Sequence, residues 1–210
     1  MNDLDCHHLI KVRRLRDGEE IVASDGLGGW RVCVLMGDDI EAVGEIEYEP
    51  PSSSFSIAMA PVKGERSEWA VAKLTELGAG TISALITDHA AIRWDEQQAI
   101  KVLERWKRVS VEAACQSRQV YLPTITGPLG LADLVGPGLA MGALGGRRIS
   151  TEVSTIAIGP EGGWSESERG LGIDCVELAG SVLRTETAAV AAGALLGWLR
   201  GGTVPLSDIS

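Results

Sequence analysis

Aromatic residues are scarce in this chain, which has only 6 Trp, 2 Tyr and 1 Phe among its 210 residues. The hydrophobic core must therefore be built mainly from Ala, Val, Leu and Ile. Cysteines are also few, and they lie far apart, at Cys6, Cys33, Cys115 and Cys175. No C-x-x-C pair or histidine cluster accompanies them, which argues against a zinc site and favours reduced, mostly buried thiols.

Long hydrophobic runs are absent as well. No apolar segment reaches the ~18 to 20 residues that would span a bilayer, and the acidic start at residues 1–5 has no secretory segment. The sequence therefore predicts a cytoplasmic protein without a membrane anchor. Basic side chains number 19 against 29 acidic ones, which argues against bulk nucleic-acid binding but leaves room for a local basic groove.

A proline- and serine-rich segment, residues 49–54, is the clearest linker, because its two prolines block helix and ladder hydrogen bonds. Short β-type runs separated by glycine turns precede it, at residues 20–23, 30–35 and 42–46. That spacing is typical of a small β-barrel. We therefore expect a barrel over residues 1–50 and a second domain over residues 55–210.

Strands and helices alternate in the second domain. The expected strands are residues 55–60, 81–87, 139–144, 154–158 and 176–178, and the expected helices are residues 67–77, 95–116 and 187–200. Trp69 and Ile100 fall on the apolar stripes of the first two helices, and Ser165 with Glu168 forms a capping box for a further short helix. The alternation predicts an α/β fold with a mainly parallel sheet covered by helices.

Glycine, by contrast, is abundant at 26 residues, and Gly159-Pro160-Glu161-Gly162-Gly163 directly follows the predicted strand 154–158. Ligands of open α/β sheets bind beyond the carboxyl ends of strands, and glycines let backbone amides approach them closely. The segment matches neither a dinucleotide fingerprint nor a phosphate-binding loop. A purely structural turn explains the same residues, so both interpretations stay open.

Two further segments carry polar residues at helix ends. Leu183-Arg184-Thr185-Glu186-Thr187-Ala188 precedes the last helix, where Thr185 or Glu186 can cap it. Arg184 faces the wrong end of the helix dipole and therefore calls for an anionic partner, either Glu161 or a ligand. Gln116 and Arg118 end the long helix. The dipole alone explains Arg118 and is slightly favoured, although both side chains also suit a substrate.

These segments, in this order, resemble the RsmE family within the SPOUT superfamily, the N3-uridine methyltransferases of 16S ribosomal RNA. The resemblance covers nearly the whole chain and rests on five blocks: residues 7–18 with Asp25-Gly26, residues 63–78, residues 112–118 with Pro123, residues 159–163 with Glu168, and residues 183–188. It implies a PUA-like β-barrel followed by a methyltransferase domain with a C-terminal trefoil knot, an exception to the rule that chains are unknotted.

The resemblance also implies a cofactor, a partner and site residues. The cofactor is S-adenosyl-L-methionine, held by three loops: one around residues 139–146, one at residues 159–163 and one at residues 183–188. The residues expected to bind it are Leu144, Gly159, Pro160, Glu161, Gly162, Gly163, Leu183, Arg184, Thr185, Glu186, Thr187 and Ala188. The expected partners are 16S rRNA in the small ribosomal subunit and a second copy of the chain, with no metal and no membrane.

For RNA, the resemblance implies contacts from Arg13, Arg14, Arg16, Gln116 and Arg118. Only six residues precede the family's His-His-Leu segment here, so either the barrel lacks its first strand or the start codon is misassigned. Residues 1–60 also carry 5 basic and 12 acidic side chains, which argues against strong RNA binding by the barrel.

Methylation of uridine N3 requires loss of the N3 proton, and the negative charge then spreads to O2 and O4. We expect Arg118, acting from a partner subunit, or Arg184 to stabilise that charge, and Glu161 or Glu186 to accept the proton. Two alternatives remain open at this stage: an RNA-binding or ribosome-assembly module with an inactive knot, and a SPOUT methyltransferase that acts on tRNA.

Overall fold

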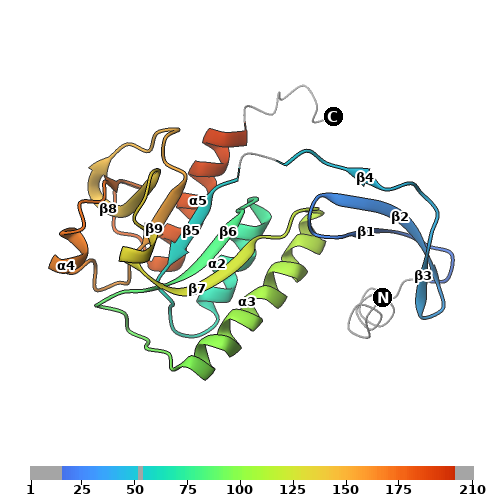
Figure 1. Cartoon of the computed structure of the whole chain (residues 1–210), viewed down its shortest axis with the longest axis horizontal. Coiled ribbons are helices and arrows are strands. Elements are labelled where there is room, and N and C mark those ends of the chain that lie inside the picture. Colours follow the sequence, from blue (N-terminus) through green and yellow to red (C-terminus); the bar gives the residue numbers. More distant parts are fainter. Residues whose placement is uncertain (1–15, 52–53, 202–210) are drawn as a thin grey trace. The chain divides into compact units, whose positions relative to one another are not determined.

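The computed structural model describes residues 16–51 and 54–201. The chain divides into two compact units, residues 1–51 and 52–210 (Figure 1). The division falls inside the segment 49–54, where prolines and serines interrupt secondary structure. Arg13, Arg14, Cys6 and the His-His-Leu segment lie outside the described residues.

The first unit is an antiparallel sheet built around one long strand. Its strands are β1 (Glu20–Ser24), β2 (Gly29–Met36), β3 (Asp39–Ala42) and β4 (Glu47–Tyr48), and β2 pairs with the other three. The prediction of a strand at 42–46 is wrong, because Gly37 adopts a left-handed φ of +62° and returns the chain early, at Asp39. The next residues instead form a loop, whose Gly44 carbonyl accepts a 2.7 Å hydrogen bond from Arg31.

The second unit holds a six-stranded sheet whose pairings are all parallel, as predicted. In spatial order its strands are β10 (Cys175–Val176), β8 (Leu139–Arg147), β9 (Thr155–Ile158), β5 (Ser56–Met59), β6 (Thr81–Ile86) and β7 (Thr124–Gly130). Strand β7 was not predicted, because Gly127-Pro128 interrupts its sequence. A proline is tolerated there because β7 lies at the edge of the sheet.

Helices cover the sheet. They are α2 (Arg66–Glu76), α3 (Glu96–Ser117), the short α4 (Glu166–Arg169) and α5 (Thr185–Gly201), with a 3₁₀ turn at Leu131–Leu134. Helix α2 packs between α3 and α5 (Figure 1), and α5 contacts β5 and β9. One core cluster lies between these helices and the sheet, around Ile57, Leu74 and Trp106. A smaller cluster, around Met141 and Trp164, covers the other face.

Local signals placed most helix ends to within one residue, although α5 starts at Thr185 rather than at residue 187 as expected, and they did not predict every buried face. The capping boxes Asp95–Gln98 and Ser165–Glu168 are both present, as predicted. Trp69 and Ile100 were expected to be buried, but 48% and 57% of their surfaces are exposed. In α2 the polar Ser67 takes the inward position instead, where its hydroxyl accepts a 3.0 Å hydrogen bond from the amide of Val62.

The β8–β10 pairing contains an abrupt shift. Cys175 pairs with Met141, but the next residue, Val176, pairs with Arg147. Residues 142–146 therefore leave the ladder, although β8 continues to Arg147 rather than ending at residue 144 as expected. Gly146 allows the two strands to approach, since a Cβ built on it would lie 2.7 Å from backbone atoms of Cys175 and Val176.

No helix within the described residues is long and apolar enough to cross a membrane.

Replacement of Gly146 by Ala should destabilise the second unit, because the new methyl group overlaps the backbone of β10. We expect a loss of ~1 to 3 kcal/mol, measured as a Tm lowered by ~2 to 4 °C per kcal/mol for a chain of this size. Gly180→Ala is the matched control, since its Cβ would meet nothing within 4 Å. Equal Tm values for the two variants would contradict this account of β8 and β10.

Candidate functional site

The two loops singled out in the sequence meet beyond the carboxyl end of β9. Residues 159–163 follow β9 directly, and Thr185 begins α5. The Thr185 hydroxyl, on a residue that is 3% exposed, donates a 3.0 Å hydrogen bond to the carbonyl of Gly159. The bond joins the end of β9 to the first turn of α5, whose leading amides have no partner inside the helix.

Trp164 joins the segment 142–146 to the loop 159–163. The indole Nε1 of Trp164 donates a 3.0 Å hydrogen bond to the Gly142 carbonyl. The same ring packs on Gly159, where a Cβ would lie 3.1 Å from it. All three predicted segments are thus held together by buried side chains, Trp164 and Thr185, that sequence periodicity did not single out as connectors.

Two glycines in these segments, Gly145 and Gly163, adopt left-handed backbone conformations. Gly145 and Gly163 have φ values of +74° and +72°, and a Cβ on either would meet nothing within 4 Å. Their backbone conformation, rather than crowding, selects glycine. Leu144, next to Gly145, leaves 61% of its surface exposed, so the segment 142–146 presents an exposed apolar side chain.

Arg66 is a site residue that the sequence analysis missed. Its Nη1 lies 3.1 Å from Glu186 Oε1 and 3.5 Å from Glu161 Oε1, so one guanidinium bridges both candidate carboxylates. Hydrogen bonding to Glu186, the strongest effect, raises the pKa of Arg66 above its ordinary value. Since Arg66 starts α2 just after β5, and β5 neighbours β9, the order of the strands is the signal that would have found it.

The two carboxylates differ in exposure. Glu186 is buried, and its Oε2 has no hydrogen-bond partner among the described residues. The side chain of Glu161 is half-exposed. Arg184 is exposed and forms no ion pair within the part of the chain that the structure describes. Of the two partners expected for Arg184, Glu161 is thus paired with Arg66 instead, and the other, an anionic ligand, stays a prediction.

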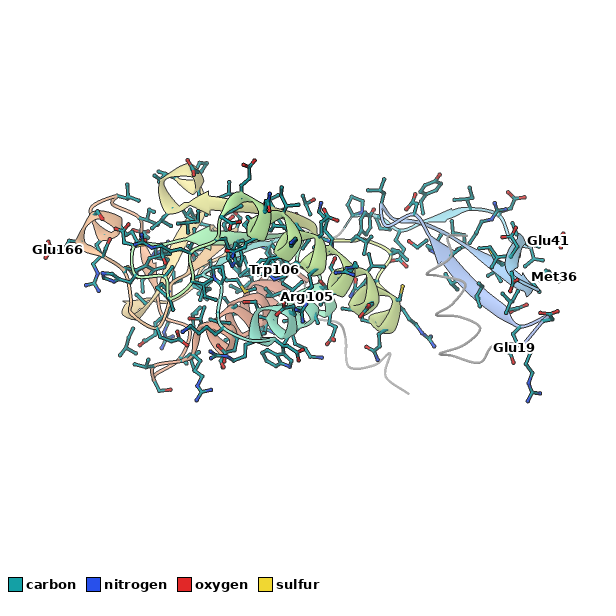
Figure 2. All side chains as sticks on the ribbon, turned by 90° about the horizontal axis from the view of Figure 1, so that it is seen from below. Glu19, Met36, Glu41, Arg105, Trp106 and Glu166 are labelled. Carbon is teal, nitrogen blue, oxygen red and sulfur yellow. The ribbon has the colours of Figure 1, made fainter. Side chains whose placement is uncertain are left out.

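A shallow groove of about 610 Å³ adjoins Arg66. It lies between α2 and α3, and its lining residues are Glu65, Arg66, Glu68, Trp69, Arg105 and Val109. Arg105, labelled with Trp106 on α3 in Figure 2, is paired with Glu68 at 3.1 Å. Both arginines of the groove, Arg66 and Arg105, thus form ion pairs with glutamates.

Arg118 and Gln116 lie beside the amino ends of the parallel strands, opposite the carboxyl ends where the three loops meet. Both are exposed at the end of α3, and Arg118 adopts a left-handed φ of 57° that caps the helix. The chain then reaches the amino end of β7, where Thr124 donates to Gly80. Strands β5 and β6 have four and six residues, so the two edges are ~13 to 20 Å apart at ~3.3 Å per residue. One chain does not bring Arg118 to Glu161.

The remaining predicted residues occupy varied surroundings. Leu183 and Ala188 are partly buried, Pro160 is buried, and Gly162 and Thr187 are exposed. Arg16 is exposed in the first unit, where its amide donates to Glu19. Within the described residues no cluster of three or more metal-binding side chains exists.

Comparison with known proteins extends these observations. A family model described as an RNA methyltransferase domain matches residues 49–137 and 140–197, and one described as an RNA methyltransferase PUA domain matches residues 3–47. The chain is 32% identical over 214 residues to "Ribosomal RNA small subunit methyltransferase E" of Mycobacterium bovis, which covers 90% of this chain and 82% of that protein.

Two solved structures have similar folds. One is a probable rRNA-methyltransferase from Porphyromonas gingivalis, with 26% identity and a TM-score of 0.78, over 95% of this chain and 92% of that chain. The other is a Ribosomal RNA small subunit methyltransferase E from Neisseria gonorrhoeae bound to S-adenosyl methionine, with 25% identity and a TM-score of 0.78, over 93% and 89% of the two chains. These matches confirm the predicted α/β fold with a PUA-like N-terminal domain.

Removal of the Thr185 hydroxyl should weaken the join between the two loops. Thr185→Val keeps the shape but leaves the Gly159 carbonyl without this donor, at an expected cost of ~1 to 3 kcal/mol. Thr187→Val, in the same helical turn but exposed, should be near neutral. Thermal unfolding of both variants tests this, and a Thr185→Val protein as stable as the control would refute it.

Proposed function

The chain belongs to the RNA methyltransferase family, and we propose that it transfers a methyl group from S-adenosyl-L-methionine to N3 of a uridine in 16S rRNA of the small ribosomal subunit. The observation that carries the proposal is the joining of segments 142–146, 159–163 and 183–188 at one edge of a parallel sheet. In open α/β folds this edge is where ligands bind. Two of the proteins described above are named ribosomal RNA small subunit methyltransferase E, which supports the class of reaction and of substrate.

The residues present fit the proposed cofactor. Gly145 and Gly163 have open space where a Cβ would stand, the amides at the start of α5 are unpaired within the helix, and Leu144 offers an apolar contact. We infer that the cofactor is held by Leu144, by residues 159–163 and by residues 183–188. When bound, it supplies a methyl group already activated by a sulfonium.

The chain's own task is then to orient the uridine and move its N3 proton. Both candidate acceptors contact Arg66, but Glu161 is the better placed, since its side chain is half-exposed and 3.5 Å from Arg66, whereas Glu186 is buried and 3.1 Å from it. Arg184, exposed and without an ion pair among the described residues, can face the negative charge that develops on the uracil oxygens.

Arg118 can join this site only from a second copy of the chain. Within one chain it lies at the amino edge of the sheet, whereas Glu161 and Arg184 lie at the carboxyl edge. The proposal therefore includes a homodimer in which Arg118 and Gln116 of one subunit face the RNA held by the other. A homodimer of this kind is symmetric, so both subunits contribute equally.

We also infer a trefoil knot in the C-terminal part. The jump in the β8–β10 pairing and the return of the chain after β10 to the loop 159–163, where Thr185 bonds to Gly159, support it. Residues 1–50 are proposed as the RNA-binding domain, with Arg13, Arg14 and Arg16 as contacts, and residues 55–210 as the methyltransferase domain. The match of residues 3–47 to an RNA methyltransferase PUA domain supports this division.

Mass spectrometry of nucleosides tests the activity. Small subunits from cells lacking the protein should lack one 3-methyluridine, and incubation with the purified protein and S-adenosyl-L-methionine should restore it. Arg184→Ala should restore it at least ~100-fold more slowly, as losses of charge-stabilising groups do. Restoration of a methylated tRNA nucleoside instead, or binding of 16S rRNA without any methylation, would overturn the proposal.

Mixing of two inactive variants tests the shared site. Arg118→Ala and Arg184→Ala should each be nearly inactive as homodimers, and both keep a Cβ, so the left-handed backbone of residue 118 is unchanged. In a reassembled equal mixture, half the dimers carry one intact site, which predicts about a quarter of wild-type activity. Activity no higher than that of the separate variants would show that Arg118 does not act across a dimer.

A further inference from the structure

A second set of contacts reaches the glycine loop from β6. Strands β6 and β9 are not neighbours, because β5 lies between them. Even so, Asp88 and His89, which follow β6, contact residues that follow β9. The connection from β6 to α3 therefore spans the carboxyl end of β5, beside the site that the proposed function uses.

Asp88 is the centre of these contacts. Its Oδ2 accepts hydrogen bonds from the hydroxyls of Ser165 and Ser167, the latter at 2.6 Å. Its backbone amide donates to Oε1 of the buried Glu168 at 3.1 Å, while Oε2 of Glu168 accepts the amide of Ser165 at 2.8 Å. We call Asp88, Ser165, Ser167 and Glu168 the Asp88 clasp.

His89 extends the clasp onto the glycines. Its Nδ1 lies 3.1 Å from the carbonyl of Gly163, and its Cβ lies 3.1 Å from the position a Cβ on Gly162 would occupy. At the other end of the same loop, Thr185 holds the carbonyl of Gly159. The loop is thus fixed at its first and last residues by side chains from two different elements.

We propose that Asp88 is a positioning residue, which through the clasp holds residues 159–163 in the shape that receives the methyl donor. The inference rests on the proposed function. A loop with three glycines has many conformations in solution, and fixing it before binding removes that entropic cost from the binding step. Hydrogen bonds from Ser165 and then Ser167 hold the pKa of Asp88 below its ordinary value, so the carboxylate is ionised at neutral pH and its hydrogen bonds are charge-assisted.

The test compares Asp88→Ala and Asp88→Asn with Asp95→Ala. Asp95 is a matched control, since it is also an aspartate that caps a helix, but its side chain bonds only to its own helix, α3. For Asp88→Ala we expect the Kd and KM for S-adenosyl-L-methionine to rise about tenfold, the effect of one lost charge-assisted hydrogen bond, with kcat within about twofold. Asp88→Asn keeps an accepting oxygen and should recover part of the loss, whereas Asp95→Ala should change neither constant.

Hydrogen exchange separates this inference from the proposed function. Without any ligand, the amides of residues 159–163 should exchange faster in Asp88→Ala than in the wild type or Asp95→Ala. If they do not, or if the two alanine variants lose cofactor affinity equally, Asp88 is not a positioning residue. If the wild type fails to bind S-adenosyl-L-methionine while exchange still speeds up in Asp88→Ala, the clasp stands and the proposed function falls.

Discussion

The hydrogen bond from Thr185 to the carbonyl of Gly159 is the interaction on which the site depends. Thr185 is buried, and its bond ties the loop after β9 to the first turn of α5. Trp164 then adds the segment 142–146 through its indole nitrogen, and Arg66 adds the start of α2 through two carboxylates. Residues more than a hundred positions apart in the sequence, such as Arg66 and Glu186, are thus in direct contact.

The order of the strands explains why these segments meet. Strand β5 is central, with β9 on one side and β6 on the other, and all three run in the same direction. Their carboxyl ends therefore open onto the same edge, where Arg66, residues 159–163 and Asp88 follow the three strands in turn. The amino edge receives the end of α3, and with it Arg118. One sheet thus separates the proposed cofactor loops from Arg118, one of the two arginines proposed to stabilise the charge on the uracil.

Short-range sequence patterns predicted the features that depend on neighbouring residues, such as helix capping boxes. Glycine after an apolar strand, and Asp95 or Ser165 three residues before a side chain that closes a capping box, were sufficient to place loops and helix starts. Interactions between distant segments were not visible in this way. The bridge from Arg66 to Glu161 and Glu186, for example, depends on strand order. A short-range contact without periodicity was also missed, since the inward position of Ser67 depends on the amide of Val62.

The long separation between paired strands also has a consequence for synthesis of the protein. Strand β5 pairs with β6, about 25 residues away, but its other edge pairs with β9, Ser56 lying beside Thr155. That edge stays open until the ribosome has made about a hundred further residues, which at ~5 to 20 residues per second takes several seconds or more. During this interval an apolar strand such as Ile57-Ala58-Met59 is exposed to pairing with other chains. The order of the strands therefore delays the completion of this sheet until late in synthesis.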